Sequence, residues 1–449
     1  MPDGTDSVED PFGGEVEAGC GFGVSGGTAA ELAARGEQFR TCGIVNGAIY
    51  ASAAEERFIG GVDDGVDGEL CYVSCDCDEL SHKSPRIEDT PHPYWSHPDG
   101  AAVNRIDMAD DRGELAVSVL DLVGMHPDGG PGAAIARSVD LAQHVEAWGY
   151  KRFWLAEHHA IGGIASAATA VLIGHVAGAT RTIRVGSGGV MLPNHAPLIV
   201  AEQFGTLEAM YPGRIDLGLG RAPGGDYQTM RALRRSLAQS GDDFPELLEE
   251  LRTYLGPERQ GQAVKAIPGQ NSNVPITLLG SSGYSAQLAA RLGLPFAFAA
   301  HFAPEYLYAA AEMYHTQFRP SEALAQPYMM VGVPVIAAET DAEARWLFTT
   351  PQQRFLRLIR NQPVELLAPV ESMDGLWNEF ERAAVESKLG AAIVGSNVTV
   401  KAGLERLVAA TGASEVIVVT DTYRHEDRLE SYRRVGEISQ TVEITAKIA

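Results

Sequence analysis

The chain of 449 residues is acidic, with 35 Lys and Arg against 59 Asp and Glu and a formal net charge of −24. Nothing in it makes a basic stripe, which argues against nucleic-acid binding and against anionic membrane surfaces. No apolar run reaches the length of a membrane span, and the first residues are acidic and glycine-rich, unlike a signal peptide. We therefore expect a cytoplasmic protein without nucleic-acid or membrane partners.

Residues 1–112 differ from the rest of the chain in charge and composition. They hold 23 Asp and Glu against 7 Lys and Arg, a net charge of −16 out of −24, so residues 113–449 carry only −8. The segment is rich in Gly, Asp, Ser and Pro and has no sustained helical or strand period. We expect an acidic extension that is largely disordered. The alternative is a start assigned too far upstream, because Met108 stands just before the first good strand.

Every cysteine lies in this leading segment, at Cys20, Cys42, Cys71, Cys75 and Cys77. The main domain therefore needs no disulfide, as expected for a cytosolic enzyme. The last three cysteines, with His82, suggest a zinc site, but their spacing is not a C-x2-C pair and no second pair follows. A thiol cluster without metal is the preferred interpretation.

From residue 115 the sequence alternates between short apolar runs and amphipathic segments. Predicted strands lie at 115–122, 153–156, 183–191, 214–220, 275–279, 295–300, 328–338 and 415–420. Predicted helices lie at 132–149, 165–179, 196–210, 244–255, 285–292, 304–318, 341–360, 376–388 and 426–446. Eight strands alternating with helices predict a parallel sheet closed into a (β/α)8, or TIM, barrel over residues 113–449. The catalytic and binding residues of such a barrel lie at the C-terminal ends of the strands and in the loops that follow them.

The second predicted strand runs directly into Glu157, His158 and His159. Successive side chains of a strand face opposite sides, so both imidazoles cannot point into the barrel. Adjacent histidines also rarely chelate one ion, and we therefore predict no metal here. One histidine is expected at the barrel mouth. The alternative is that both histidines only cap the end of the strand with hydrogen bonds.

Glycine-rich ends of the third, fourth and fifth strands indicate a bound ligand. Glycines in a strand interior often mark close approach by a flat molecule, and residues 186–189 contain three. Arg221 ends the fourth strand and could bind a phosphate bidentately, or form an ordinary surface ion pair. Residues 280–285 lead into a helix whose first N–H groups favour an anion. Together these features predict a flat aromatic ligand with a phosphate.

Residues 115–445 resemble the bacterial-luciferase-like flavin-dependent monooxygenases, a (β/α)8 family. The resemblance rests on WLAEHH, on RVGSGGVMLPNHAPLIVAEQFGTLEAMYPGRIDLGLGRAPG and on LLGSSGYSAQLAARLGLPFAFA, in that order along the chain. It implies FMN as the cofactor, supplied in reduced form by a separate flavin reductase, with O2 and a small organic molecule as substrates. It also implies a homodimer.

The resemblance also assigns roles to individual residues. It implies that His158 is the catalytic residue, near the reactive edge of the flavin, and that a cis peptide at Gly188-Gly189 supports the flavin ring. It further implies cofactor contacts by the set Glu157, Gly188, Gly189, Arg221, Ser281, Ser282, Gly283, Tyr284 and Ser285. Ser281 stands where the luciferases proper have an acidic residue, which weakens any expectation of light emission. The long connection 222–245 is expected to form a lid over the site.

Three alternatives share this fold. A dehydrogenase dependent on the deazaflavin F420 would transfer a hydride without oxygen, but its cofactor has a longer acidic tail that calls for more cations than Arg221. A non-catalytic flavin-binding subunit would not need His158. A metal-dependent hydrolase lacks the expected H-x-H at the first strand. The organic substrate stays open, with a long-chain aldehyde, a sulfonate and a polyketide intermediate as candidates.

Overall fold

The computed structural model describes residues 43–45, 48–50, 114–221, 227–233 and 243–442. The chain divides into two units, Met1–Trp95 and Ser96–Ala449. In the first unit, β1 (Gly43–Val45) and β2 (Ala48–Tyr50) pair antiparallel, although the sequence there shows no sustained strand period. The rest of the predicted extension, its five cysteines included, lies outside the described residues. The predicted boundary at residue 112 therefore stays a prediction.

The second unit contains one parallel sheet. Its strands are β3 (Ala116–Asp121), β4 (Arg152–Leu155), β5 (Arg184–Met191), β6 (Ile215–Gly220), β7 (Ile276–Gly280), β8 (Phe296–Ala299), β9 (Met329–Ala337), β10 (Ile393–Gly395) and β11 (Glu415–Val419). They are ordered β10-β9-β11-β3-β4-β5-β6-β7-β8. Strand β8 also pairs with β9, which closes eight strands into a barrel and leaves β10 as an addition beside β9. The predicted (β/α)8 barrel is confirmed.

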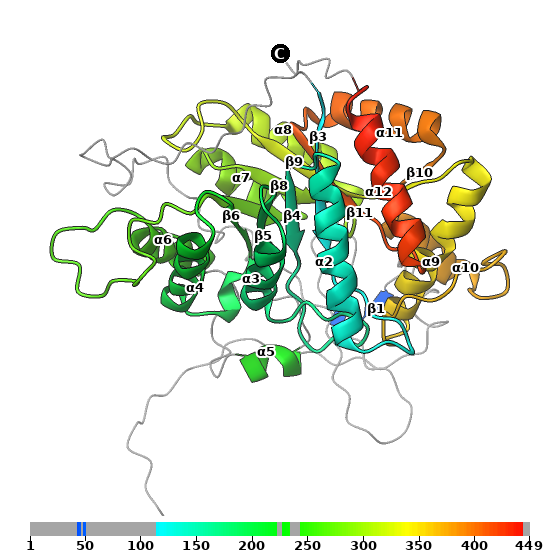
Figure 1. The fold of residues 1–449 in the computed structure, drawn as a ribbon, viewed down its shortest axis with the longest axis horizontal. Coiled ribbons are helices and arrows are strands. Elements are labelled where there is room, and N and C mark those ends of the chain that lie inside the picture. Colours follow the sequence, from blue (N-terminus) through cyan, green and yellow to red (C-terminus); the bar gives the residue numbers. More distant parts are fainter. Residues whose placement is uncertain (1–42, 46–47, 51–113, 222–226, 234–242, 443–449) are drawn as a thin grey trace, which may run out of the picture. The chain divides into compact units, whose positions relative to one another are not determined.

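Helices surround this barrel (Figure 1). They are α2 (Pro131–Ala147), α3 (Thr169–Ala179), α4 (Pro197–Met210), α5 (Tyr227–Leu233), α6 (Phe244–Leu255), α7 (Gly283–Leu292), α8 (Leu307–Gln317), α9 (Asp341–Ile359), α10 (Glu379–Lys388), α11 (Asn397–Thr411) and α12 (His425–Ser439), with the 3-10 turns η1 (Leu192–Asn194) and η2 (Pro304–Tyr306). Neighbouring helices touch along the ring, for example α2 with α3 and α12 with α2. Among the described helices, none is both long and apolar enough to cross a bilayer.

The strands bury both of their faces, which divides the core into two parts. Along β3, Val117 and Val119 join the cluster between the strands and the helices, whereas Leu120 joins a smaller cluster with Trp154 and Met330. This alternation follows from the period of two in a strand, which points successive side chains outward and inward. Burial of a large apolar side chain is worth about 1.5–3 kcal/mol, so both clusters stabilise the closed barrel.

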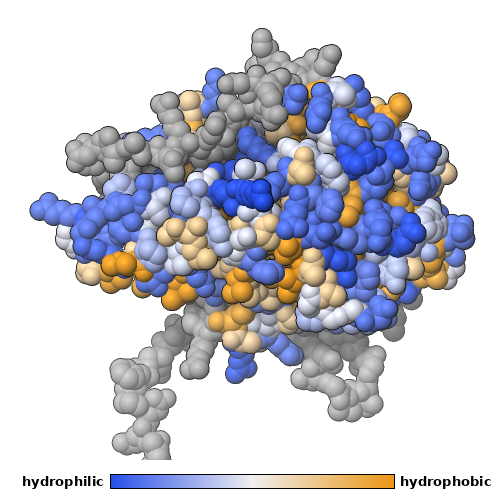
Figure 2. Space-filling view, in the orientation of Figure 1, coloured by the Kyte–Doolittle hydropathy of each residue, from blue (hydrophilic) through white to orange (hydrophobic). Residues whose placement is uncertain are grey.

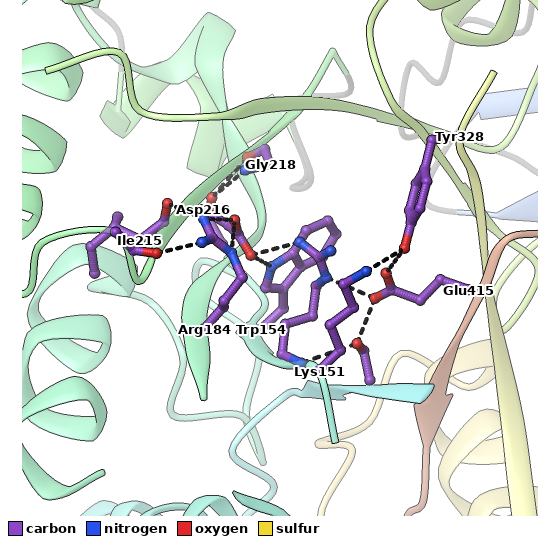
Figure 3. A network of polar contacts seen from close by, with 12 residues as sticks. Lys151, Trp154, Arg184, Ile215, Asp216, Gly218, Tyr328 and Glu415 are labelled. Atoms are coloured by element: carbon purple, nitrogen blue, oxygen red, sulfur yellow. Dashed lines mark hydrogen bonds and ion pairs between the residues drawn. The ribbon is translucent and has the colours of Figure 1, made fainter. Parts of the chain in front are cut away.

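A buried polar network lies at the end of the barrel where the strands begin (Figure 3). Arg152, the first residue of β4, binds Asp216 through Nη1 at 2.8 Å and Glu415 through Nε at 2.7 Å. Arg184 binds Asp216 from the other side at 2.6 Å, and Tyr328 donates to Glu415. Burial alone would raise the pKa of Asp216, but the two guanidinium groups hold it below its ordinary value. Functional residues of a (β/α)8 barrel lie at the opposite end, where the strands end.

Strand β10 and helices α5 and α11 were missing from the sequence prediction, which assigned nothing between residues 389 and 414 and only a long connection at 222–245. Strand β10 is short, and α11 contains Gly403, which weakens its helical signal. A side chain at Gly403 would meet the Ile393 side chain at 2.5 Å, so glycine lets α11 approach β10 closely. The buried positions Val400, Leu404 and Leu407 nevertheless carry the helical spacing that would have revealed α11.

Other predicted boundaries moved by a few residues. Helix α3 begins at Thr169 rather than 165, because the preceding segment leaves the strand and pairs with the loop after β3, as in the Ile164–Gly124 bridge. Helix α10 begins at Glu379 rather than 376, where Asn378 and Glu381 form a reciprocal cap. Helix α12 ends at Ser439 rather than 446. Most of the predicted lid lies outside the described residues, apart from α5 and residues 243–245.

Candidate functional site

The predicted site residues come together because every barrel strand ends at the same rim. His158 follows β4, the glycine pair lies in β5, Arg221 follows β6 and Ser281 follows β7. These four strands are consecutive neighbours in the sheet. The barrel therefore assembles, on one half of its mouth, residues that span more than 120 positions of the sequence.

His158 is a neutral, partly buried imidazole at this rim. Its backbone N–H donates to the Ser166 carbonyl at 3.0 Å, while its side-chain Nδ1 is buried without a hydrogen-bond partner among the described residues. Burial lowers the pKa of His158 to about 4, with further lowering by Arg354 and His301, against a smaller opposing effect of Glu157. At neutral pH the ring therefore carries no charge and can hold or accept a proton.

His159 points to a different partner, in agreement with the expectation that the adjacent imidazoles diverge. Its Nε2 lies 2.8 Å from Glu157 Oε1. The Nε2 of His195, which the sequence analysis had not singled out, lies 2.8 Å from the same oxygen. The backbone N–H of Met191 donates to the other oxygen, Oε2, at 3.2 Å. We call Glu157, His159 and His195 the carboxylate clamp, because it ties the end of β4 to the end of β5.

The three donor atoms of the carboxylate clamp lie within 4.8 Å of one another, and two imidazoles with a carboxylate are a set that binds zinc. Bonds of about 2.0–2.1 Å at tetrahedral angles would separate these ligand atoms by about 3.3 Å. The two distances of 2.8 Å are instead those of hydrogen bonds. The clamp as it stands is a hydrogen-bonded assembly.

Glu157 was predicted to contact the cofactor, but the structure uses both of its oxygens within the protein. The side chain is almost fully buried, and burial alone would raise its pKa. The hydrogen bonds from His195 and His159 outweigh burial and hold the pKa below its ordinary value, so the group is ionised. These hydrogen bonds hold the end of β4 to the end of β5 and to His195, close to His158 and to the glycine pair.

The glycine pair has the predicted backbone, because the Gly188-Gly189 peptide is cis. A Cβ on Gly188 would lie 2.6 Å from Leu120 Cδ1, and one on Gly189 would lie 2.7 Å from the Gly218 carbonyl oxygen. The pairing of β5 with β6 also shifts register between Ser187 and Val190. A side chain at either position would force a neighbour to move, and the two glycines leave a strand surface without side chains where a flat ring could lie.

Arg221 and the predicted phosphate turn meet at the next two strand ends. The guanidinium carbon of Arg221 lies 4.3 Å from the centroid of the Tyr284 ring. Helix α7 begins at Gly283, two residues earlier than predicted, with Ser282 as its N-cap. The Ser282 side chain makes no capping hydrogen bond, so it does not occupy the first N–H groups of the helix. A cation beside a helix N-terminus fits a phosphate.

Ser285, which the sequence analysis placed at the start of the helix, lies inside α7 and is buried. A Cβ on Gly280 would meet its Oγ at 2.5 Å, so Ser285 packs against the end of β7. Ser281 and Gly283 are half-buried beside it. The turn from residue 280 to 285 is thus brought to the mouth as one compact unit, although Ser285 has a packing role within it.

The other half of the mouth holds polar residues that the sequence analysis missed. Arg354 of α9 donates from Nη1 to Asp421, which follows β11, at 2.5 Å. His301 follows β8, and burial lowers its pKa to about 4. These residues lie in no motif, although an Arg on the buried face of a helix and a charged residue just after a strand are signals that could have found them.

Comparison with known proteins agrees with this arrangement. The pattern that defines the luciferase-like monooxygenases matches residues 115–415. The chain belongs to the luciferase-like monooxygenase family. Its members are oxidoreductases, so this protein is an enzyme of that class, and the resemblance seen in the sequence is confirmed.

Relatives of this luciferase-like monooxygenase cover the whole barrel. An uncharacterised Bacillus subtilis protein, YvbT, is 54% identical over 330 residues, which are 73% of this chain and 98% of the relative. A luciferase-like monooxygenase of Escherichia coli K12 is 46% identical over 326 residues, 73% of this chain and 97% of the relative. The solved apo structure of MsnO8 is 36% identical, has a TM-score of 0.65, and is matched over 72% of this chain and 98% of its own.

Solved structures of lower identity share the fold alone. One is the oxygenating component of 3,6-diketocamphane monooxygenase in complex with FMN, at 18% identity and a TM-score of 0.55. Another is an F420-dependent secondary alcohol dehydrogenase, at 13% identity and a TM-score of 0.54. The same fold therefore occurs in one protein that binds FMN and in another that depends on F420.

Proposed function

We propose that the protein is a flavin-dependent monooxygenase that uses reduced FMN and O2 to oxygenate a small organic substrate. The observation that supports it best is the meeting of Arg221 with the start of α7, one strand away from the cis glycine pair. A phosphate bound by Arg221 and the first turn of α7 would direct the ring of the same molecule toward the bare surface of β5. The residues present therefore fit FMN.

The chain's own contribution is to bind, orient and manage protons. Bound reduced FMN would supply two electrons for the activation of O2, with one oxygen atom going to the organic substrate and the other leaving as water. His158 is neutral at neutral pH, so its Nδ1 can accept a proton or pass one on beside the reacting atoms. The carboxylate clamp holds the backbone on either side of that imidazole.

A separate flavin reductase is proposed as the source of reduced FMN. The family resemblance implies it, and the sequence contains no nicotinamide-binding fingerprint that would let the chain reduce its own flavin. We propose the cytoplasm as the compartment, where such a reductase and its nicotinamide are available.

The test is an anaerobic titration of the full chain with reduced FMN and, separately, with reduced F420, followed by mixing with oxygenated buffer. The expected result is stoichiometric binding of reduced FMN, and flavin reoxidation whose course differs from that of free flavin. Binding of reduced F420 alone, with no response to oxygen, would instead assign hydride transfer. Binding of FMN with a reoxidation like that of free flavin would point to a non-catalytic flavin-binding subunit, and binding of neither cofactor would overturn the proposal.

A homodimer is the proposed oligomeric state. Figure 2 shows hydrophobic residues gathered on the lower left of the view, over the region of α4 and α6 in Figure 1. Among the exposed large hydrophobic residues, Val171 belongs to α3 and Ile199 and Met210 belong to α4, two helices that contact each other. Exposed apolar groups of this kind are stabilised by a partner surface. Light scattering coupled to size exclusion would give twice the chain mass of 47.9 kDa.

A further inference from the structure

Among the described residues, the buried side-chain nitrogens without a hydrogen-bond partner include two at the barrel mouth that the proposed reaction leaves unexplained or uses alone. They are Nη2 of Arg354 and Nδ1 of His158, whereas the nearby ring of His301 interacts with the backbone of Gly332. A buried donor left without a partner costs about 1–3 kcal/mol, and such groups are rare in folded proteins. The two histidines follow β4 and β8, which lie four strands apart around a ring of eight, so they face each other across the mouth.

Arg354 reaches this mouth from α9. Its side chain is only 6% exposed, and Nη1 is used by the ion pair with Asp421. That ion pair leaves the second terminal nitrogen buried with its two N–H groups unused. The charge of Arg354 contributes to lowering the pKa of His158, and the charge of Asp421 opposes the lowering of the pKa of His301. The four groups therefore lie close to one another.

His301 is held over the neighbouring strand by a glycine. A Cβ on Gly332 of β9 would lie 2.9 Å from His301 Nδ1, so any larger residue there would displace the imidazole. Gly332 lies in the interior of β9, where a barrel strand normally carries a branched residue. The absence of a side chain at residue 332 thus lets the His301 ring reach the backbone of β9.

Together, Arg354, Asp421, His158 and His301 carry no net charge. Arg354 and Asp421 neutralise each other, and both histidines are uncharged at neutral pH because burial lowers the pKa of each to about 4. An anion bound here would remain without compensation in a buried setting, which is costly. A neutral oxygen that accepts a hydrogen bond would satisfy Nη2 at no such cost.

We propose that Arg354, oriented by Asp421 and flanked by His301, binds a neutral carbonyl oxygen of the organic substrate. The site lies at the ends of β8, β9 and β11, apart from the β5, β6 and β7 ends that carry the proposed FMN contacts. The identity of the ligand as the oxygenated substrate rests on the proposed function. The recognition of a neutral carbonyl rests only on the contacts and charges described.

The test uses three fluorinated probes of nearly equal shape and the full chain, with no flavin added. They are 4-fluoroacetophenone, which has a neutral carbonyl, 4-fluoro-α-methylstyrene, which has CH2 in place of that oxygen, and 4-fluorobenzoate, which is an anion. Affinities are measured by fluorine NMR titration. The expected result is binding of the ketone about 10-fold more tightly than either other probe, the effect of one charge-assisted hydrogen bond.

Arg354→Met is expected to abolish this preference, and Arg354→Lys to reduce it while keeping a charge beside Asp421. If the methionine variant fails to fold, the lysine variant decides. Arg357→Met, one turn along the same helix, removes an arginine paired with Glu365 at 3.2 Å and should keep the preference. Equal affinities for the three probes, no binding of the ketone, or a preference that survives both Arg354 substitutions would overturn the proposal. Because no flavin takes part, a failure of the proposed function would leave this result unchanged.

Discussion

The guanidinium of Arg221 lies 4.3 Å from the centroid of the Tyr284 ring, so a residue after β6 is stacked on the first turn of α7. This cation–π contact orients the guanidinium without using its charge on a carboxylate. Its nitrogens are then held beside the helix N-terminus, where both the charge and the helix dipole favour a phosphate. The contact thus joins two motifs that lie 63 positions apart in the sequence.

Replacement of Arg221 by Met is expected to weaken binding of FMN by about 10- to 100-fold, the loss of hydrogen bonds to a charged phosphate. Binding of riboflavin, which has no phosphate, should change little. Fluorescence titration with both flavins measures the two affinities. Arg181→Met, at an exposed position before β5, is the matched control and should leave both unchanged. Equal weakening of FMN and riboflavin would contradict a phosphate contact.

Replacement of His158 by Ala is expected to lower oxygenation by about 100-fold or more and to leave FMN affinity within a few-fold of the original. The reason is that a general acid–base group contributes to the reaction rather than to binding of the cofactor. Substrate oxygenation and flavin affinity are measured side by side. His175→Ala, on the exposed side of α3, should keep full activity. Unchanged turnover in the His158 variant would remove it from the reaction.

The carboxylate clamp is expected to contribute measurably to stability. Glu157→Gln removes the charge from three hydrogen bonds and should lower the free energy of unfolding by about 1–3 kcal/mol. Denaturant unfolding measures it, with the exposed Glu312→Gln as control. A double-mutant cycle between Glu157→Ala and His195→Ala should give a coupling energy of about 0.5–3 kcal/mol. Strictly additive effects of the two substitutions would show that the contact between Glu157 and His195 contributes no coupling energy.

Acidification between pH 6.5 and pH 5 is expected to destabilise the fold through the two mouth histidines. Their pKa is about 4 in the native protein and about 6.5 when unfolded, so the unfolded chain binds protons first. Each histidine therefore stabilises the fold fully above pH 6.5 and loses up to about 1.4 kcal/mol per pH unit below it. His158→Gln and His301→Gln should each flatten the dependence in urea unfolding at several pH values. An unchanged slope in both variants would mean that the native fold does not lower the pKa of these rings.

The glycine pair is expected to be intolerant of any side chain, and Gly189 more so than Gly188. A Cβ on Gly188 meets the end of the Leu120 side chain, which can rotate, whereas one on Gly189 meets a backbone oxygen, which cannot. Gly189→Ala should therefore lower thermal stability more than Gly188→Ala, by an amount equivalent to about 1–3 kcal/mol. Gly132→Ala, where an added Cβ has no neighbour within 4 Å, is the control. The reverse order of the two variants would contradict this packing.

The sequence by itself determined the architecture and one half of the mouth. Alternating apolar runs give the eight strands because a strand buried on both faces must be apolar throughout, and the rim follows from parallel strands. Glycines at residues 186–189 and the small residues at 280–285 were visible because their composition departs from that of an ordinary strand. Helix α11 was missed because Gly403 and several β-branched residues weaken the local signal on which such a prediction depends.

Tertiary structure decided the contacts that no local pattern carries. His195 meets Glu157 from 38 positions away, and Arg354 meets Asp421 from 67 positions away, because barrel closure brings separate strand ends within hydrogen-bond distance. Closure also decides protonation, since it buries His158 beside Arg354 and His301 and so lowers its pKa to about 4. Spacing along a chain predicts which way a side chain points. The burial of a side chain, and the charged groups buried beside it, depend on residues far away in the sequence.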